Sequence, residues 1–211
     1  MSRILLTAVI CSLTLSAAVL AAPAADEAAH VKPLGPGDAA PNFTVRRPDG
    51  SEFDFEPSRR DAPAVLIFYR GGWCPYCNAH LAELRHVVPQ LTDRGYEVLF
   101  LSADRPELLR DSLEVDVPDY TLLSDSRMLA ARAFGVAFRV DDSTYERYRS
   151  LGLDLEATSG EKHHELPVPA VFVLDRQGVI RYVHANPDYK VRISAGELEL
   201  AVAALDGSDG S

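Results

Sequence analysis

The stretch AVLIFYRGGWCPYCNAHLAELRHVV, residues 64–88, carries two cysteines, Cys74 and Cys77, with only two residues between them. A continuous apolar run of strand length precedes the pair, and apolar residues at spacings of three and four follow it. This pattern predicts a strand buried on both faces that leads into a helix beginning between the cysteines. A Cys-x-x-Cys pair is half of a metal site, a short structural disulfide or a redox-active dithiol.

Strand and helix patterns alternate on both sides of this stretch. Asp49-Gly50 predicts a hairpin turn between short alternating segments, and Pro89 is expected to kink or end the helix that follows the cysteines. Ser126 is the expected cap of a helix that Gly135 ends. Further strands are predicted at 95–104, 120–125 and on both sides of a turn at 176–178, and further helices at 105–115, 126–136 and 194–205.

The order of these elements predicts the fold class. A β-α-β opening followed by a β-β-α closing gives an α/β, thioredoxin-like fold, in which a mixed central sheet is flanked by helices. An N-terminal hairpin precedes it, and the polar segment 137–167 inserts a helix at 143–153 and a loop at 156–166. We expect one domain, residues 41–206.

The N-terminal residues have a different character. One basic residue, Arg3, precedes an uncharged, mostly apolar run that ends in small residues. The pattern is typical of a secretory signal peptide, and an uncleaved membrane span is the alternative. We predict a signal peptide at 1–24, a flexible lead-in at 25–40, export with the bacterial periplasm as the expected location, and cleavage after one of three alanines, Ala21, Ala22 or Ala24.

Export determines the cysteine count of the mature protein. Cys11 lies inside the apolar run and is expected to leave with the signal, so Cys74 and Cys77 form the only pair. In an oxidising compartment a reducing thiol partner must keep such a pair reduced. The net charge of −10 gives no electrostatic reason to expect nucleic acid as a partner.

The spacing of the pair suits redox chemistry. Pro75 is favoured at the first position of a helix, which makes Cys74 the N-cap. There the free N–H groups and the helix dipole can lower the pKa of a thiol from about 8.5 to roughly 7. Cys77 lies one turn further along the same face and can attack a mixed disulfide on Cys74.

Two other interpretations of the pair are weaker. A structural disulfide that closes so short a loop gains little, about 2 kcal/mol. A zinc site needs two more ligands, and the adjacent histidines His163 and His164 in a polar loop are more often solvated. No metal site and no cofactor are therefore predicted.

Two segments carry a resemblance to a known family. FYRGGWCPYC (68–77) has the Trp-Cys-x-Pro type of hallmark found in thioredoxins, and PVPAVFVLDRQGVIRYVHANPDYKVRISAGEL (167–198) is similar to the C-terminal half of peroxiredoxins. The chain resembles the AhpC/TSA-type peroxiredoxin-like family of the thioredoxin-fold superfamily, from about Pro41 to Leu205. The resemblance implies a thiol-dependent oxidoreductase that reduces peroxides, and such chains often form homo-oligomers.

The peroxiredoxin signature Pro-x-x-x-Thr-x-x-Cys, laid on this sequence, places the peroxidatic cysteine on Cys77. The threonine position then falls on Cys74 and the proline position on Arg70, so two of the three defined residues differ. The later active-site arginine of that family corresponds to Arg192, where a guanidinium could lower a thiolate pKa and polarise an O–O bond. A solvated arginine before a helix is the alternative.

The resemblance also implies residues that bind a substrate or partner. Pro169 matches the cis-proline of thioredoxin-fold proteins, which would direct the Val168 backbone at a bound cysteine; Pro167 is the weaker match. Together with Pro75, the aromatic residues Trp73 and Tyr76 are expected to rim the sulfurs, although simple core packing is open for Trp73.

Other polar residues near the site receive weaker assignments. His80 could face the site as a proton shuttle, but a surface imidazole is the preferred interpretation. The remaining ones are expected to be loop and cap residues: Asp104, Arg105, Asp188 and Tyr189.

Three functions follow from these residues. The first is an exported peroxidase that cycles through a sulfenic acid and a Cys74–Cys77 disulfide. The helix N-cap favours Cys74 as the attacking sulfur and the family signature favours Cys77. The second is a thiol–disulfide oxidoreductase acting on protein disulfides, and the third is a copper-handling protein that uses the two thiolates and His184.

Overall fold

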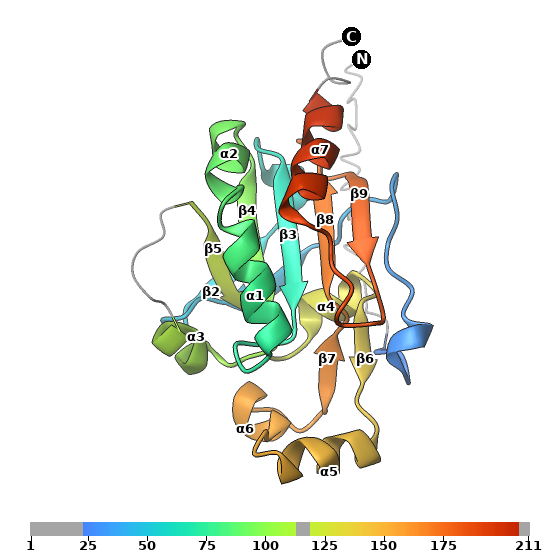
Figure 1. The fold of residues 1–211 in the computed structure, drawn as a ribbon. Coiled ribbons are helices and arrows are strands. Elements are labelled where there is room, and N and C mark those ends of the chain that lie inside the picture. The colour runs from blue at the N-terminus through green and yellow to red at the C-terminus, as the bar shows by residue number, and fades with distance from the viewer. Residues whose placement is uncertain (1–22, 113–118, 207–211) are drawn as a thin grey trace, which may run out of the picture.

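The computed structural model describes residues 23–112 and 119–206. Within them a seven-stranded sheet has the order β2-β1-β5-β4-β3-β8-β9, and a two-stranded sheet pairs β6 with β7 (Figure 1). The strands are β1 (Phe43–Arg46), β2 (Glu52–Phe55), β3 (Ala64–Tyr69), β4 (Glu97–Ser102), β5 (Thr121–Ser124), β6 (Ala137–Arg139), β7 (Glu165–Pro167), β8 (Ala170–Leu174) and β9 (Ile180–Ala185).

The large sheet is mixed, as the sequence predicts. β3 pairs in parallel with β4 and β4 with β5, whereas β8 runs antiparallel to both β3 and β9. The predicted hairpin is β1 and β2, which pair antiparallel beside β5 and turn at Gly50 with φ +88°. The α/β thioredoxin-like fold class is therefore confirmed.

Helices cover both faces of the sheet (Figure 1). Because β3 is central and fully buried, its alternate residues feed two cores: Val65 and Ile67 pack on the side of α1, α2 and α7, and Leu66 and Phe68 on the side of α4. The helices are η1 (Ala28–His30), η2 (Pro57–Arg59), α1 (Pro75–Leu84), α2 (Val88–Asp93), α3 (Pro106–Ser112), α4 (Leu129–Ala133), α5 (Asp142–Ser150), α6 (Leu155–Ser159) and α7 (Ala195–Asp206).

Some local predictions need correction. The helix after the cysteines ends at Leu84, and α2 begins at Val88 with Pro89 in its first turn, as expected. The cap of α4 was assigned to the wrong residue, because the Asp125 carboxylate accepts the N–H groups of Ala130 and Ala131, whereas the Ser126 hydroxyl accepts from Arg46. The predicted loop at 156–166 contains most of the short helix α6.

Backbone hydrogen bonds attach the segment before β1, residues 25–37, to the rest of the domain. Ala25 exchanges backbone hydrogen bonds with β6, the Lys32 N–H donates to the Gly135 carbonyl, and the Gly37 N–H donates to that of Ile180. The predicted signal peptide, Cys11 included, lies almost wholly in residues 1–22, outside the described residues. Among residues 23–112 and 119–206, no helix is long and apolar enough to cross a membrane.

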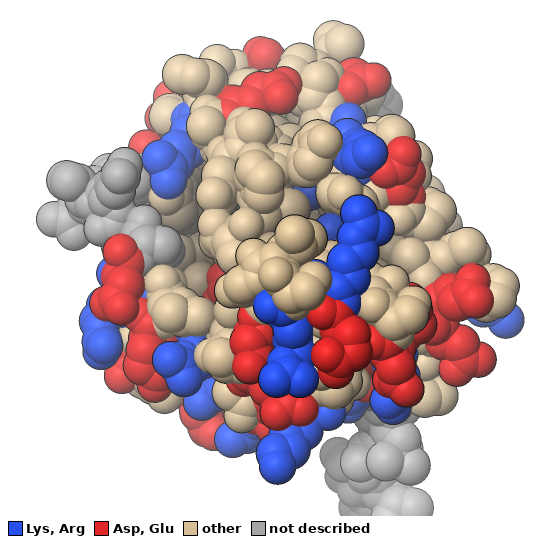
Figure 2. Space-filling model, turned by 60° about the horizontal axis from the view of Figure 1, so that its bottom comes forward, with Lys and Arg blue, Asp and Glu red and all other residues tan. Residues whose placement is uncertain are grey.

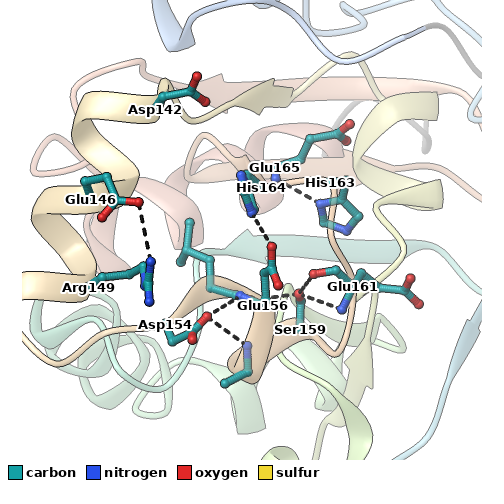
Figure 3. Close-up of polar contacts among 12 residues, drawn as sticks. Asp142, Glu146, Arg149, Asp154, Glu156, Ser159, Glu161, His163, His164 and Glu165 are labelled. Carbon is teal, nitrogen blue, oxygen red and sulfur yellow. Dashed lines mark hydrogen bonds and ion pairs between the residues drawn. The ribbon is translucent and has the colours of Figure 1, made fainter.

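The inserted segment lies below the large sheet in Figure 1, at the end where α1 begins. Polar contacts fix its shape (Figure 3): the Asp154 carboxylate caps α6, and the Nε2 atom of His164 lies 2.8 Å from the Glu156 carboxylate. The His164 ring also stacks on Tyr145 of α5, with centroids 3.9 Å apart. These contacts join α5, α6 and β7 into one unit.

The end of α4 offers a test of the packing of the N-terminal segment. Gly135 has φ +71°, and a Cβ atom there would lie 2.0 Å from the Lys32 carbonyl oxygen. Gly135→Ala is expected to lower the free energy of unfolding by roughly 3 kcal/mol, measured by urea titration, because backbone strain and a backbone clash add. Gly152→Ala is the matched control, because Gly152 has φ +85° but a Cβ atom there would have no other atom within 4 Å. Only backbone strain should act there and lower the free energy of unfolding by about 1 kcal/mol. Equal losses would contradict the proposed clash.

Candidate active site

A tight turn carries the chain from β3 into α1. Gly71 has φ +141°, and a Cβ atom there would lie 2.7 Å from an Asp104 carboxylate oxygen and 2.4 Å from Trp73 Nε1, so only glycine fits. The Cys74 N–H donates to the Gly71 carbonyl, and Cys74 is the N-cap of α1 with Pro75 at the next position, as predicted. The turn therefore places the first sulfur at the positive end of the helix dipole.

Both cysteines are free thiols buried beneath the surface. Cys74 is 2% exposed and Cys77 is fully buried. A hydrogen bond from the Cys77 side chain, helped by Arg70 and Arg192, lowers the pKa of Cys74 to about 6. The same hydrogen bond, together with burial and the neighbouring charge on Cys74, raises the pKa of Cys77. The geometry therefore favours a pair with a Cys74 thiolate and a Cys77 thiol at neutral pH.

Arg192 reaches the pair from the loop before α7. Its Nη2 atom donates to the Cys77 sulfur at 3.3 Å, and its Nε atom donates to the Tyr189 carbonyl at 3.1 Å. Its Nη1 atom is buried and has no hydrogen-bond partner among the described residues. Arg192 is therefore not a solvated arginine, which was the alternative prediction, because its guanidinium points inward at the Cys77 sulfur.

The rim of the pair is aromatic. Tyr76 is 44% exposed and packs edge-on against Tyr189, with centroids 5.5 Å apart. Trp73 is partly buried, contacts both cores and lies 6.2 Å from the ring of Tyr148 in α5. Trp73 therefore serves core packing and the site together.

The region of Pro169 differs from the prediction. No cis peptide bond occurs within the described residues, so the cis assignment of Pro169 is wrong. The Val168 N–H donates to the Val136 carbonyl and is not free to bind a partner, because β7 and β6 approach each other here. Val168, Pro169 and Arg70 instead help to line a cavity of about 340 Å³.

The buried polar groups beside the site are more numerous than the sequence suggests. His80 is 6% exposed, and its Nε2 atom lies 2.9 Å from the Ile193 carbonyl oxygen. The prediction that the His80 imidazole lies on the surface is therefore wrong. Burial lowers the pKa of His80 to about 4, which keeps it neutral. Asp104 is buried, accepts the Gly72 N–H at 2.7 Å and holds the turn.

The remaining candidates lie away from the sulfurs. Arg105 pairs with Glu107 at 3.8 Å on the surface, and Asp188 accepts the Lys190 N–H as a loop cap. The Nε2 atom of His163 lies 2.8 Å from the Ser126 carbonyl oxygen. Its Nδ1 atom accepts the Glu165 N–H (Figure 3). Among the described residues no three His, Cys, Asp or Glu side chains gather as metal ligands, so the copper interpretation with His184 lacks a donor set.

Figure 2 shows the surface at the end of the molecule where the insert lies. Acidic and basic side chains alternate over its lower half, and the middle of the face is largely uncharged. Neither positive nor negative side chains predominate on this face.

Comparison with known proteins identifies the family. The AhpC/TSA family pattern matches residues 36–183. The chain belongs to the AhpC/TSA family. It is 33% identical over 109 residues to peroxiredoxin Bcp of Escherichia coli K12, covering 50% of this chain and 67% of that protein. It is 27% identical over 150 residues to chloroplastic peroxiredoxin Q of Oryza sativa subsp. japonica, covering 71% of this chain and 58% of that protein.

The fold comparison agrees with the sequence comparison. Peroxidoxin BcpB from Mycobacterium tuberculosis superposes with a TM-score of 0.62 at 20% identity, covering 82% of this chain and 97% of the other. The protein is therefore a thiol-dependent oxidoreductase of this family. Arg192 lies beyond the residues that the family pattern matches.

Asp104 provides a pH-dependent test of the turn. Burial raises the pKa of its carboxyl from 3.8 to about 6, so the fold favours the protonated form. Its stabilising contribution is present below pH 4 and is lost as the pH rises through 6. Asp104→Asn should therefore gain stability relative to the wild type between pH 4 and pH 7, by about 3 kcal/mol, because the difference between carboxyl pKa values of 3.8 and about 6 corresponds to that free energy.

The measurement is urea unfolding of both proteins at several pH values. Asp125, whose pKa burial raises to about 7, is common to both proteins and cancels in the difference. A stability difference that stays constant from pH 4 to pH 7 would show that the Asp104 carboxyl does not titrate in this range.

Proposed function

We propose that this protein reduces peroxides through a reversible Cys74–Cys77 disulfide. The observation that carries the proposal is the arrangement of the pair: two free, buried thiols at the start of α1, with Arg192 Nη2 3.3 Å from Cys77. Membership of the AhpC/TSA family and the likeness to peroxiredoxin Bcp support the same reaction.

The reaction follows from the two protonation states. The Cys74 thiolate attacks one peroxide oxygen, an S–O bond forms, the O–O bond breaks, and the leaving oxygen takes a proton from the Cys77 thiol. Cys74 is then a sulfenic acid and Cys77 a thiolate. Attack by the Cys77 thiolate on the sulfenic acid forms the S–S bond, breaks the S–O bond and expels hydroxide, which takes one proton from solvent to give water. A reducing thiol partner then restores the dithiol.

Cys74 is proposed as the first attacker because its pKa is the lower of the two. The family signature would give this role to Cys77, but that thiol is fully buried, and its contact with Cys74 together with burial raises its pKa. Arg192 beside Cys77 then serves two steps: its unpartnered Nη1 can bind the peroxide, and its positive charge stabilises Cys77 when that sulfur loses its proton.

The test is stopped-flow oxidation of the reduced protein by hydrogen peroxide, followed through Trp73, the single tryptophan of the chain. We expect oxidation at least a hundredfold faster than that of free cysteine. Cys74→Ser should abolish it, whereas Cys77→Ser should keep the first step and accumulate a sulfenic acid that dimedone traps. Loss of reactivity in Cys77→Ser alone would assign the attack to Cys77, and rates no faster than free cysteine would remove the peroxidase function.

One observation favours a second candidate, thiol–disulfide exchange with proteins. Tyr76 and Val191 are each 44% exposed beside the buried pair, and together they offer an apolar surface to a partner chain. In this function Cys74 attacks a protein disulfide and Cys77 resolves it. Reduction of an insulin disulfide in the same preparation would distinguish it from peroxide reduction.

We further propose export with removal of residues 1–24. The sequence pattern of the first residues supports this, and the Ala25 hydrogen bonds to β6 support a mature chain that is ordered from its beginning. N-terminal sequencing of the protein from a bacterial periplasmic fraction should give a chain beginning at residue 22, 23 or 25. An intact N-terminus in the membrane fraction would favour the uncleaved span. A homo-oligomer stays a prediction.

A further inference from the structure

Arg70 is a buried cation without an anionic partner. It is 4% exposed and forms no ion pair with any described carboxylate. Asp26, Glu27 and Asp141 line the same cavity, but none is within ion-pair distance. A buried guanidinium without a counter-charge is costly, so its surroundings must compensate it in another way.

An aromatic cage surrounds this guanidinium. Its centre lies 5.1 Å from the ring centroid of Trp73, 5.7 Å from that of Tyr148 and 4.5 Å from that of Tyr189. Its Nη2 atom donates to the Tyr148 hydroxyl, while its Nε atom is buried and has no hydrogen-bond partner in the part of the chain that the structure describes. Cation–π contacts stabilise a positive charge but do not neutralise it, so the cage keeps the charge active.

The fold brings this cage to the dithiol from three directions. Arg70 directly follows β3, and the turn through Gly71 returns the chain to Cys74 after three residues. Tyr189 belongs to the loop that also carries Arg192. Tyr148 belongs to α5, where Tyr145 stacks on the ring of His164. The Nε2 atom of His164 lies 2.8 Å from the Glu156 carboxylate of α6, which attaches α5 to the rest of the insert (Figure 3).

Tyr189 connects the cage to the dithiol, because its ring lies 4.5 Å from the Arg70 guanidinium and its carbonyl accepts a hydrogen bond from Arg192. The Nη2 atom of Arg192 lies 3.3 Å from the Cys77 sulfur. Arg70 is among the groups that lower the pKa of Cys74, together with Arg192, and the Arg70 backbone forms a hydrogen bond that favours the Cys77 thiolate. A thiolate compensates the buried cation, whereas a disulfide carries no charge. Oxidation of the pair therefore leaves Arg70 with its aromatic cage alone.

We propose that Arg70, held in the cage of Trp73, Tyr148 and Tyr189, is a positioning residue that stabilises the dithiol over the Cys74–Cys77 disulfide. The disulfide is thereby easier for a partner thiol to reduce. This role rests on the reversible disulfide proposed above. It also accounts for an arginine at the position where the peroxiredoxin signature has proline.

The equilibrium with glutathione measures this effect directly. Cys74 and Cys77 lose two electrons and form one S–S bond, while the S–S bond of oxidised glutathione breaks and each of its sulfurs gains one electron. The Cys77 thiol and one solvent proton supply the two protons that the glutathione thiols take up. Alkylation of free thiols and mass spectrometry give the reduced fraction without relying on Trp73, which the substitutions would disturb.

Arg70→Gln and Arg70→Met both remove the positive charge, one with a polar and the other with an apolar side chain. If one variant fails to fold, the other can still be measured. Each is expected to shift the equilibrium about tenfold toward the disulfide, since one nearby charge changes a thiol pKa by about one unit. For this two-electron couple, a tenfold change in the equilibrium constant corresponds to a reduction potential that is about 30 mV more negative. Arg70→Lys keeps the charge and should shift the equilibrium much less.

Arg59→Met is the matched control, because it removes an exposed arginine paired with Glu56 and leaves the dithiol site untouched. Wild-type equilibrium constants in folded Arg70→Gln or Arg70→Met would overturn the inference, as would an equal shift in Arg59→Met. Slow peroxide oxidation of the wild type would instead remove the peroxidase function and leave the glutathione measurement valid.

Discussion

The close packing at Gly71 is the constraint on which the site depends. The backbone at φ +141° passes so near the Asp104 carboxylate and the Trp73 ring that a side chain has no room. Because the turn is that tight, only five residues separate β3 from α1, with Arg70 first among them and Cys74, the N-cap of α1, last. The helix dipole, the aromatic rim and the arginine cage all act on the sulfurs through this one turn.

The electrostatics of the site follow from burial combined with an excess of positive charge. The guanidinium of Arg192 lies 3.3 Å from the fully buried Cys77 sulfur, and the buried Arg70 stands four residues before Cys74. Neither arginine forms an ion pair with a described carboxylate. In a medium of low dielectric constant such charges act strongly on their neighbours. The pair can therefore carry a negative charge that an isolated buried thiol could not, which is the property that nucleophilic sulfur chemistry requires.

Much of the fold followed from local patterns in the sequence. The uniformly apolar β3, the Asp49-Gly50 turn and the break at Pro89 each have a physical cause within a few residues, and each was found where predicted. The cap of α4 was missed because Asp125 and Ser126 are equally able to cap, and only the approach of Arg46 occupies the serine. The burial of His80 was missed because it requires the loop before α7 to cover α1.

The sequence alone determined the class of chemistry: a Cys-Pro-Tyr-Cys pair at a strand-to-helix junction suits a redox dithiol, because Pro75 fixes the helix start and no other cysteine follows. It left peroxide reduction and protein-disulfide exchange both open. Tertiary structure alone decided which groups act on that pair. Arg192 is 115 residues from Cys77 and Tyr148 is 78 residues from Arg70, yet both make direct contact. Residues so far apart meet only when the sheet and the insert have folded, because local sequence preferences do not determine long-range packing.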